Sequence, residues 1–269
     1  MDELEALLEA VRKSAKYREV CTEVIRGIGA QELSKGRGFR EAVKATKGKL
    51  HQVGAAYLAG RLSYGRWLEQ LELASRTGQP GHVRAVCREA MRSHSSTRER
   101  LSILERFFAE TLGPLAPISS VLDVACGLNP LAIPWMPLAS SARYYGCEMY
   151  TDMAEFLNAA LPLLGVHGTV EARDVTRSPP TVKADVALIL KSLPCLEQVA
   201  PSSSARLLSE VRCDILLVTY PVHSLGGKGK GMLRNYEGQF WALVKGQGWS
   251  VKRLVFETEL AFIVNKNPA

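Results

Sequence analysis

The chain has 269 residues, 46% of them hydrophobic and 23% charged, which suits one large globular domain or a core domain with a smaller attachment. Its net charge of +7 lies in the first 100 residues, which hold 19 Lys and Arg against 12 Asp and Glu, whereas residues 101–269 hold 15 of each. No apolar run approaches the ~18 residues that a membrane span needs, and the acidic N-terminus lacks the basic-then-apolar order of a secretory signal, so we expect a cytoplasmic protein without membrane contact.

The charge asymmetry suggests an anionic partner for the N-terminal part, with nucleic acid the first candidate. A solvated helical surface with a mild basic bias explains the charge equally well. The six cysteines form no C-x-x-C pair and mostly lie in apolar segments. Such thiols are typical of reduced, partly buried cysteines, so we expect neither a metal site nor a disulfide.

The first 110 residues have the pattern of helices. An apolar stripe with i, i+3, i+4, i+7 spacing begins at Leu4, and Gly27 and Gly29 predict a break after it. Further helices are expected over residues 39–57, around 67–71 and on both sides of 93–96. Ser96 and Glu99 have the spacing of a capping box, which predicts that the last of these helices begins at Ser96.

From residue 119 onward, short apolar runs alternate with helical stretches. The runs that we expect to form strands are 121–125, 144–147, 170–172, 186–190 and 215–219. This alternation predicts βαβ units and a mainly parallel sheet. Two last runs, 251–256 and 260–264, are joined by a tight connection and predict a hairpin that adds an antiparallel strand to the sheet.

The end of the first expected strand carries the strongest chemical signal. In open α/β sheets, ligands bind beyond the carboxyl ends of the strands, and here Asp123 is followed by Gly127 and Pro130. A single glycine lets the backbone approach a ligand closely. The segment is not the G-x-G-x-x-G of dinucleotide sites, and the proline would disrupt a phosphate-binding helix start. A cofactor without phosphates, such as S-adenosylmethionine, is therefore favoured over a pyrophosphate cofactor.

Two more acids end the next two strands. Glu148 could accept hydrogen bonds from both ribose hydroxyls of a nucleoside cofactor, and Asp174 could accept one from an adenine amino group. Each acid alone is as well explained by a solvated strand end, a turn or a helix cap. Acids at the ends of three consecutive strands together favour a nucleoside site.

The loops after the fourth and fifth strands are candidates for substrate contact. Lys191 begins the first of them, and residues 224–231 combine four glycines with Lys228 and Lys230. This second loop is either a solvated connection or a substrate clamp, in which the lysines neutralise phosphate and Tyr236 stacks on a base.

Several segments together resemble the aminoglycoside-resistance 16S rRNA methyltransferases of the Arm/Rmt/Sgm type, which act on guanine N7 in the decoding site. The matching segments span nearly the whole chain and are 49–51, 94–100, 123–131, 190–194, 224–232, 235–236 and 259–260. The resemblance implies a Rossmann-like class I methyltransferase sheet over residues 93–269, preceded by a basic helical domain over residues 1–92 that docks on the 30S subunit. It also implies a monomer that uses S-adenosyl-L-methionine and releases S-adenosyl-L-homocysteine.

The resemblance also assigns residues by matched position. The cofactor site would be lined by Tyr57, His94, Ser95, Ser96, Thr97, Arg98, Glu99, Arg100, Ala125, Glu148, Asp174, Val175 and Leu190. Arg100 would hold the methionine carboxylate, since a guanidinium binds a carboxylate with two parallel hydrogen bonds. Glu148 stands where relatives often have Asp. The substrate RNA would be contacted by Lys44, Lys47, Lys49, Lys191, Lys228, Lys230, Met232 and Tyr236.

Guanine N7 carries a free lone pair and no proton, so its methylation needs alignment rather than a general base, and we nominate no catalytic acid or base. Two alternatives stay open. The enzyme could methylate another RNA base or a protein, or the chain could be a non-catalytic RNA-binding module. The three strand-end acids and Arg100 argue against the module, which has no use for a cofactor pocket.

Overall fold

The computed structural model describes residues 2–60, 62–223 and 231–268. The α-helices are α1 (Glu3–Arg12), α2 (Thr22–Ser34), α3 (Phe39–Val53), α4 (Tyr64–Arg76), α5 (Pro80–Met91), α6 (Ser95–Arg100), α7 (Leu104–Thr111), α8 (Thr151–Leu163), α9 (Leu193–Val199), α10 (Ser203–Glu210) and α11 (Met232–Val244). Short 3-10 helices are η1 (Ala15–Tyr17), η2 (Ala55–Tyr57), η3 (Gly113–Leu115) and η4 (Asn129–Trp135). The strands are β1 (Ile118–Val124), β2 (Leu138–Glu148), β3 (His167–Ala172), β4 (Ala184–Leu190), β5 (Cys213–Pro221), β6 (Ser250–Val255) and β7 (Glu259–Asn265).

The seven strands form one sheet in the order β3-β2-β1-β4-β5-β7-β6. Strands β3, β2, β1, β4 and β5 are parallel to one another, and β7 runs antiparallel to both β5 and β6. All seven expected strands and the C-terminal hairpin are therefore present. The chain order reverses between β1 and β4, which makes the carboxyl ends of these two strands the expected place for a ligand.

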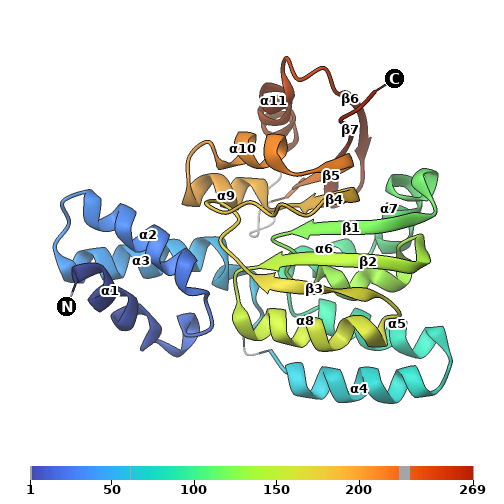
Figure 1. Cartoon of the computed structure of the whole chain (residues 1–269), viewed down its shortest axis with the longest axis horizontal. Helices are drawn as coiled ribbons and strands as arrows, with labels where there is room; N and C mark the ends of the chain where they lie inside the picture. The colour runs from blue at the N-terminus through green and yellow to red at the C-terminus, as the bar shows by residue number, and fades with distance from the viewer. Residues whose placement is uncertain (1, 61, 224–230, 269) are drawn as a thin grey trace.

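Helices cover both faces of the sheet (Figure 1). One side carries α4, α5 and α8, and the other carries α9, α10 and α11. Strand β4 has the sequence ADVALIL and is buried at every position but Asp185, because a central parallel strand is covered on both faces. The core accordingly has two parts, one around Leu157 and Val121 and one around Phe240 and Phe262, whose rings stack at 3.7 Å.

Helices α1 to α3 form a projecting unit at one end of the molecule, whereas α4 and α5 lie beside the sheet, against α8 and η4 (Figure 1). The unit made of α1 to α3 is called the N-terminal unit below. Its apolar side chains belong to the same core as the face of the sheet that α8 covers. The boundary predicted at residue 92 remains a prediction, and the packing places α4 and α5 with the sheet.

Two predictions about the helices are wrong. Gly27 and Gly29 lie inside the unbroken helix α2, where a Cβ on Gly27 would meet the Arg177 guanidinium at 2.2 Å and one on Gly29 would meet Leu7 at 2.6 Å. These glycines therefore permit close packing rather than a break. The capping box also fails, because α6 begins at Ser95 and has no side-chain cap.

No helix in the described part of the chain is long and apolar enough to cross a membrane. Within the same residues, no group of three or more His, Cys, Asp or Glu side chains is placed to hold a metal ion.

Candidate functional site

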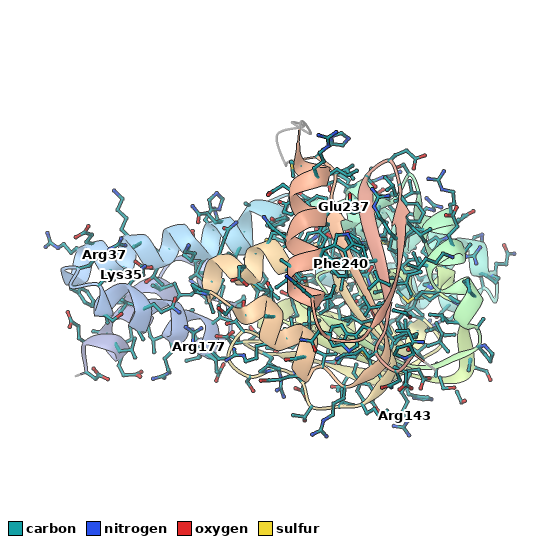
Figure 2. All side chains as sticks on the ribbon, turned by 90° about the horizontal axis from the view of Figure 1, so that it is seen from above. Lys35, Arg37, Arg143, Arg177, Glu237 and Phe240 are labelled. Atoms are coloured by element: carbon teal, nitrogen blue, oxygen red, sulfur yellow. The ribbon has the colours of Figure 1, made fainter. Side chains whose placement is uncertain are left out.

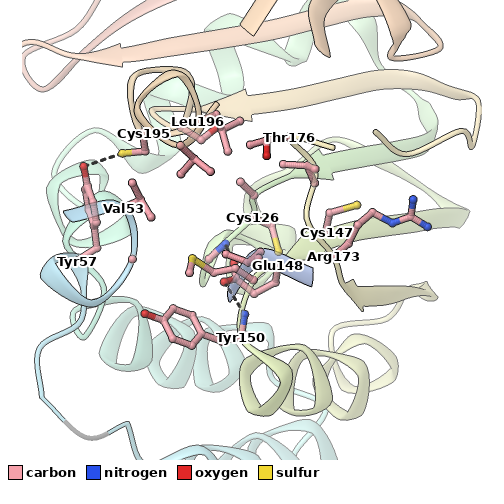
Figure 3. A pocket seen from close by; sticks show the side chains of 18 of the residues that line it. Val53, Tyr57, Cys126, Cys147, Glu148, Tyr150, Arg173, Thr176, Cys195 and Leu196 are labelled. Atoms are coloured by element: carbon pink, nitrogen blue, oxygen red, sulfur yellow. Dashed lines mark hydrogen bonds between the residues drawn. The ribbon is translucent and has the colours of Figure 1, made fainter. Parts of the chain in front are cut away.

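A concave pocket opens at the carboxyl ends of β1, β2, β3 and β4 (Figure 3). The sheet contributes the segments 125–127, 147–150, 173–176 and 190–192. Helices α2, α3 and α9 contribute Val24, Val53, Cys195, Leu196 and Val199. The cavity therefore lies at the predicted edge of the sheet, and the N-terminal unit forms part of its wall.

Glu148 lies in the wall of this cavity at the end of β2. Its two carboxylate oxygens accept hydrogen bonds from the backbone N–H groups of Gly127 at 2.8 Å and Tyr150 at 3.2 Å. Gly127 has a positive φ of 52°, which glycine adopts without strain, and this conformation belongs to the tight turn after β1. Burial raises the pKa of Glu148 above its usual value, against the backbone hydrogen bonds that lower it. The carboxylate is thus fixed in place and has lone pairs left for a ligand.

Asp174 lies beyond the end of β3 and is almost fully buried. It accepts hydrogen bonds from the Thr176 backbone N–H at 2.9 Å and from the Arg177 guanidinium at 2.9 Å. Arg177 also donates to the carbonyl oxygen of Gly27 in α2 at 2.8 Å. Figure 2 shows Arg177 where the N-terminal unit meets the rest of the molecule. One side chain therefore links the second pocket acid to the N-terminal unit.

Aromatic and polar side chains complete the cavity. The rings of Tyr57 and His94 stack with centroids 6.1 Å apart, and the Tyr57 hydroxyl lies 3.0 Å from the Cys195 thiol (Figure 3). Burial, together with the charges of Lys191 and two arginines, lowers the pKa of His94 to about 4, so this ring is neutral at pH 7. Within the described residues, the buried atoms His94 Nδ1 and Ser192 Oγ have no hydrogen-bond partner. Unpartnered polar atoms in a cavity wall are available to form hydrogen bonds with a ligand.

The family described as ribosomal RNA methyltransferase (FmrO) matches residues 13–263. The chain belongs to this family. The 16S rRNA (guanine(1405)-N(7))-methyltransferase of Frankia casuarinae is 38% identical over 261 residues, which cover 96% of this chain and 92% of that protein. The enzyme of the same name from Micromonospora echinospora is 35% identical and covers 98% and 97%.

A similar solved structure is the 16S rRNA methyltransferase RmtF in complex with S-adenosyl-L-homocysteine. It has a TM-score of 0.84 and 27% identity, and the match covers 99% of both chains. The predicted family and the predicted fold class, a class I methyltransferase sheet behind a helical N-terminal region, are confirmed.

The structure of this rRNA methyltransferase brings together eight of the thirteen predicted cofactor residues. Those that line the cavity are Tyr57, His94, Ser96, Ala125, Glu148, Asp174, Val175 and Leu190. The other five are Ser95, Thr97, Arg98, Glu99 and Arg100, and all lie on α6. Because a helix presents only one side to the cavity, a contiguous run of helical residues cannot all line it. Thr97, for example, points back and donates to the carbonyl of Met91 at 2.7 Å.

Arg100 is fully buried behind the cavity wall. It donates two hydrogen bonds to Glu259, from Nε at 2.7 Å and from an Nη at 3.1 Å, and a third to Asn129 at 2.8 Å. Its carboxylate partner in this structure is therefore a side chain of the methyltransferase itself. Its predicted contact with the methionine carboxylate stays a prediction. Two of the five N–H groups of the guanidinium make none of these hydrogen bonds and remain for that contact.

The predicted RNA contacts differ in their exposure. Lys44 on α3 is exposed and Lys47 and Lys49 are half-buried, as are Met232 and Tyr236 on α11. Tyr236 stacks on Tyr220 with ring centroids 5.1 Å apart. Lys228 and Lys230 lie outside the described residues. These RNA contacts remain predictions.

Lys191 is placed differently from the sequence prediction. Its ammonium is buried and binds the Ser96 carbonyl at 2.6 Å and the Glu99 carboxylate at 2.9 Å. A lysine already held by a carboxylate inside the protein is a poor phosphate ligand. The structure therefore argues against the predicted contact between Lys191 and RNA.

The sequence did not point to the pocket residues of the N-terminal unit, Val24, Val53 and Gly54. They reach the cavity because the chain before α2 lies against the segment after β2: Cys21 N donates to the Met149 carbonyl at 2.8 Å, and Thr151 N donates to the Glu19 carbonyl at 2.7 Å. Nothing local in the sequence signals a contact between segments over 120 residues apart. Tyr150 could have been predicted from the sequence, because it lies two residues after Glu148, where β2 ends.

Proposed function

We propose that this methyltransferase transfers a methyl group from S-adenosylmethionine to N7 of guanine 1405 of 16S rRNA, within the assembled 30S subunit, and thereby confers aminoglycoside resistance. The observation that carries the proposal is a pocket of buried carboxylates at the sheet edge, in a chain that matches enzymes of this printed activity over nearly its full length. The S-adenosyl-L-homocysteine of the RmtF structure is the product expected of such a reaction.

The residues present fit S-adenosylmethionine. Glu148 is held by two backbone N–H groups in a position to accept from ribose hydroxyls, and Asp174 is held by Thr176 and Arg177 at the next strand end. His94 Nδ1 and Ser192 Oγ remain for polar groups of the ligand. When bound, this cofactor supplies an electrophilic methyl carbon.

The chain's own residues bind, orient and exclude water. Guanine N7 attacks through its lone pair, so no side chain has to remove a proton. His94 is neutral at pH 7 because its pKa is lowered to about 4, which fits a ring that forms hydrogen bonds and stacks rather than one that carries protons. Tyr57 supplies aromatic surface in the cavity wall beside Cys195 of α9, and Tyr236, whose ring stacks on Tyr220, supplies the aromatic surface proposed for a base.

The N-terminal unit is proposed to dock on the 30S subunit as part of a monomer. Residues 1–53 carry a net charge of +3, with 11 Lys and Arg against 8 Asp and Glu, and helix α3 holds Lys44, Lys47 and Lys49. Lysines bound to phosphate release counterions, so affinity for the subunit should fall steeply with salt.

The proposal is tested by primer extension on 16S rRNA from cells that express the chain, after borohydride reduction and aniline cleavage. We expect a stop at guanine 1405 with the wild type and none with Glu148→Ala. Cells with the wild type should survive 4,6-disubstituted aminoglycosides. A stop at another base, or no stop although purified protein binds cofactor, would refute the proposed target. Purified 30S subunits should be methylated much better than naked rRNA fragments.

A further inference from the structure

Glu259 lies in one of the segments that resemble the methyltransferase family, but no function has been assigned to it above. It is the first residue of β7 and is fully buried, yet it does not line the cavity. Its carboxylate binds Arg100 through both oxygens and lies 3.5 Å from the Lys191 ammonium. Burial alone would raise the pKa of Glu259, but the charges of Arg100 and Lys191 outweigh this effect and hold the pKa below its usual value.

The two cations that meet at Glu259 belong to two different walls of the cavity. Arg100 is the last residue of α6, whose N-cap His94 and whose Ser96 line the cavity. Lys191 belongs to the loop between β4 and α9, whose residues 190–192 also line it. The Lys191 ammonium crosses from this loop to the Ser96 carbonyl of α6. Glu259 therefore ties both walls to the C-terminal hairpin.

The backbone of Lys191 supports a functional reason for this arrangement. Its φ is +59°, a left-handed conformation that is strained for a non-glycine residue. Its side chain is 4% exposed and the side chains of Arg100 and Glu259 are 0% exposed. Burying ions is costly, and apolar side chains of similar volume often stabilise a protein as well or better. Strain and buried charge in one place indicate that position, rather than stability, is what these residues provide.

We propose that Glu259 is a positioning residue for the cofactor pocket: its charge holds Arg100 and Lys191 together, and so fixes α6 and the loop after β4 at the spacing that the cofactor requires. The proposal rests on the proposed methyltransferase function. Without the carboxylate, Arg100 and Lys191 are two buried cations whose nearby acids are Asp123, whose charge acts on Arg100, and Glu99, which pairs with Lys191, and the two walls move apart.

The test uses the full chain and S-adenosyl-L-homocysteine in titration calorimetry, at a temperature where circular dichroism shows each variant folded. Glu259→Gln keeps the shape of the side chain and removes the charge, and we expect the dissociation constant to rise at least tenfold. Glu259→Asp keeps the charge and should give a smaller rise. The matched control is Glu32→Gln, since Glu32 is also a buried carboxylate between two cations, Lys35 and Arg37, but lies in the N-terminal unit. Glu32→Gln should bind S-adenosyl-L-homocysteine with a dissociation constant within twofold of the wild-type value.

If Glu259 acts through packing alone, Glu259→Gln should bind S-adenosyl-L-homocysteine like the wild type, because it preserves the side-chain volume. That result overturns the proposal. An equal loss in Glu32→Gln also overturns it, because the effect would then be general destabilisation. If Glu259→Gln does not fold, Glu259→Asp decides: we expect at least a threefold rise, and wild-type affinity refutes the proposal. The binding assay needs no RNA, so a wild type that binds cofactor but leaves guanine 1405 unmodified refutes only the proposed target.

Discussion

Charged side chains are arranged in opposite ways in the N-terminal unit and at the sheet edge. In the N-terminal unit, Glu32 is buried but its partners Lys35 and Arg37 are 52% and 35% exposed, and Lys44 faces solvent. Figure 2 shows Lys35 and Arg37 at the end of the molecule that is farthest from the sheet. At the sheet edge, Glu148, Asp174 and the Arg100–Glu259 pair are almost completely buried.

The two arrangements suit two tasks. Exposed charges act over a Debye length of about 10 Å at 0.1 M salt. They attract an anionic surface without requiring a fixed geometry, and this attraction weakens as the salt concentration rises. Buried charges resist screening, but they are expensive to desolvate, so they persist where exact geometry is needed. The difference suits the two proposed roles, attraction of RNA by the N-terminal unit and orientation of a small ligand by the sheet edge.

The largest effect is expected from the buried acids. Glu148→Ala and Asp174→Ala should each weaken binding of S-adenosyl-L-homocysteine about 10- to 100-fold, because a hydrogen bond to a charged group contributes ~1.5–3 kcal/mol. Methyl transfer should fall at least as far. Calorimetry gives the affinities, and a filter-binding assay with tritiated cofactor gives the rate. Wild-type affinity in both variants would mean that the cofactor lies elsewhere.

Reversing the charge of the α3 lysines should weaken binding of the other proposed partner, the 30S subunit. Glu substitutions at Lys44, Lys47 and Lys49 together should weaken 30S binding on the order of 30-fold and make the slope of log affinity against log salt shallower by about 3, since three phosphate contacts are lost. Sedimentation with 30S subunits at several salt concentrations measures both. Cofactor affinity should not change.

The matched control for this triple variant reverses three exposed lysines elsewhere, Lys183, Lys245 and Lys252. It makes the same change in net charge away from α3. If it weakens 30S binding equally, net charge rather than a docking surface on α3 explains the effect.

Most of the fold could be predicted from the sequence, because its strands are short apolar runs that alternate regularly with helical stretches. The sequence also led us to expect Glu148 and Asp174 in one pocket, where both lie, since the carboxyl ends of parallel strands meet at one edge, and their cofactor contacts stay predictions. Local propensity failed at Gly27 and Gly29, where close packing against Arg177 and Leu7 overrides the usual cost of glycine in a helix.

The burial of Lys191 could not be predicted for a different reason. A lysine beside a substrate loop is normally solvated, and only its ion pairs with Glu99 and Glu259, 92 and 68 residues away, show otherwise. Such pairs depend on the tertiary structure. The same holds for Val24 and Val53, whose place in the pocket follows from how the N-terminal unit meets the segment after β2.

The free energy of unfolding, measured as a function of pH, tests the buried side chains of the pocket. Because the pKa of His94 is about 4 in the folded chain and near 6.5 when unfolded, the unfolded state binds the proton first as pH falls. The wild type should therefore lose up to about 2 kcal/mol of stability between pH 7.5 and pH 5 that His94→Gln does not lose. Urea unfolding at both pH values gives the difference. Equal losses in the two proteins would show that His94 titrates normally.

The smallest effect is expected where the two regions meet. A methyl group on Gly27 would collide with the Arg177 guanidinium, which there binds both the Gly27 carbonyl and Asp174. Gly48 in α3 is the matched control, because nothing lies within 4 Å of a Cβ added to it. Alanine at Gly48 should stabilise the chain by roughly 0.5–1 kcal/mol, the usual gain in a helix. Alanine at Gly27 should bring no such gain and should leave that variant about 1–2 kcal/mol less stable than the control, since it displaces a charged hydrogen bond.

Cofactor affinity should fall slightly in the Gly27 variant, by no more than about threefold, because Asp174 keeps its Thr176 hydrogen bonds. Thermal unfolding and calorimetry on the two variants measure these effects. If both glycines respond alike, Arg177 moves aside freely and the N-terminal unit and the pocket are not coupled through it.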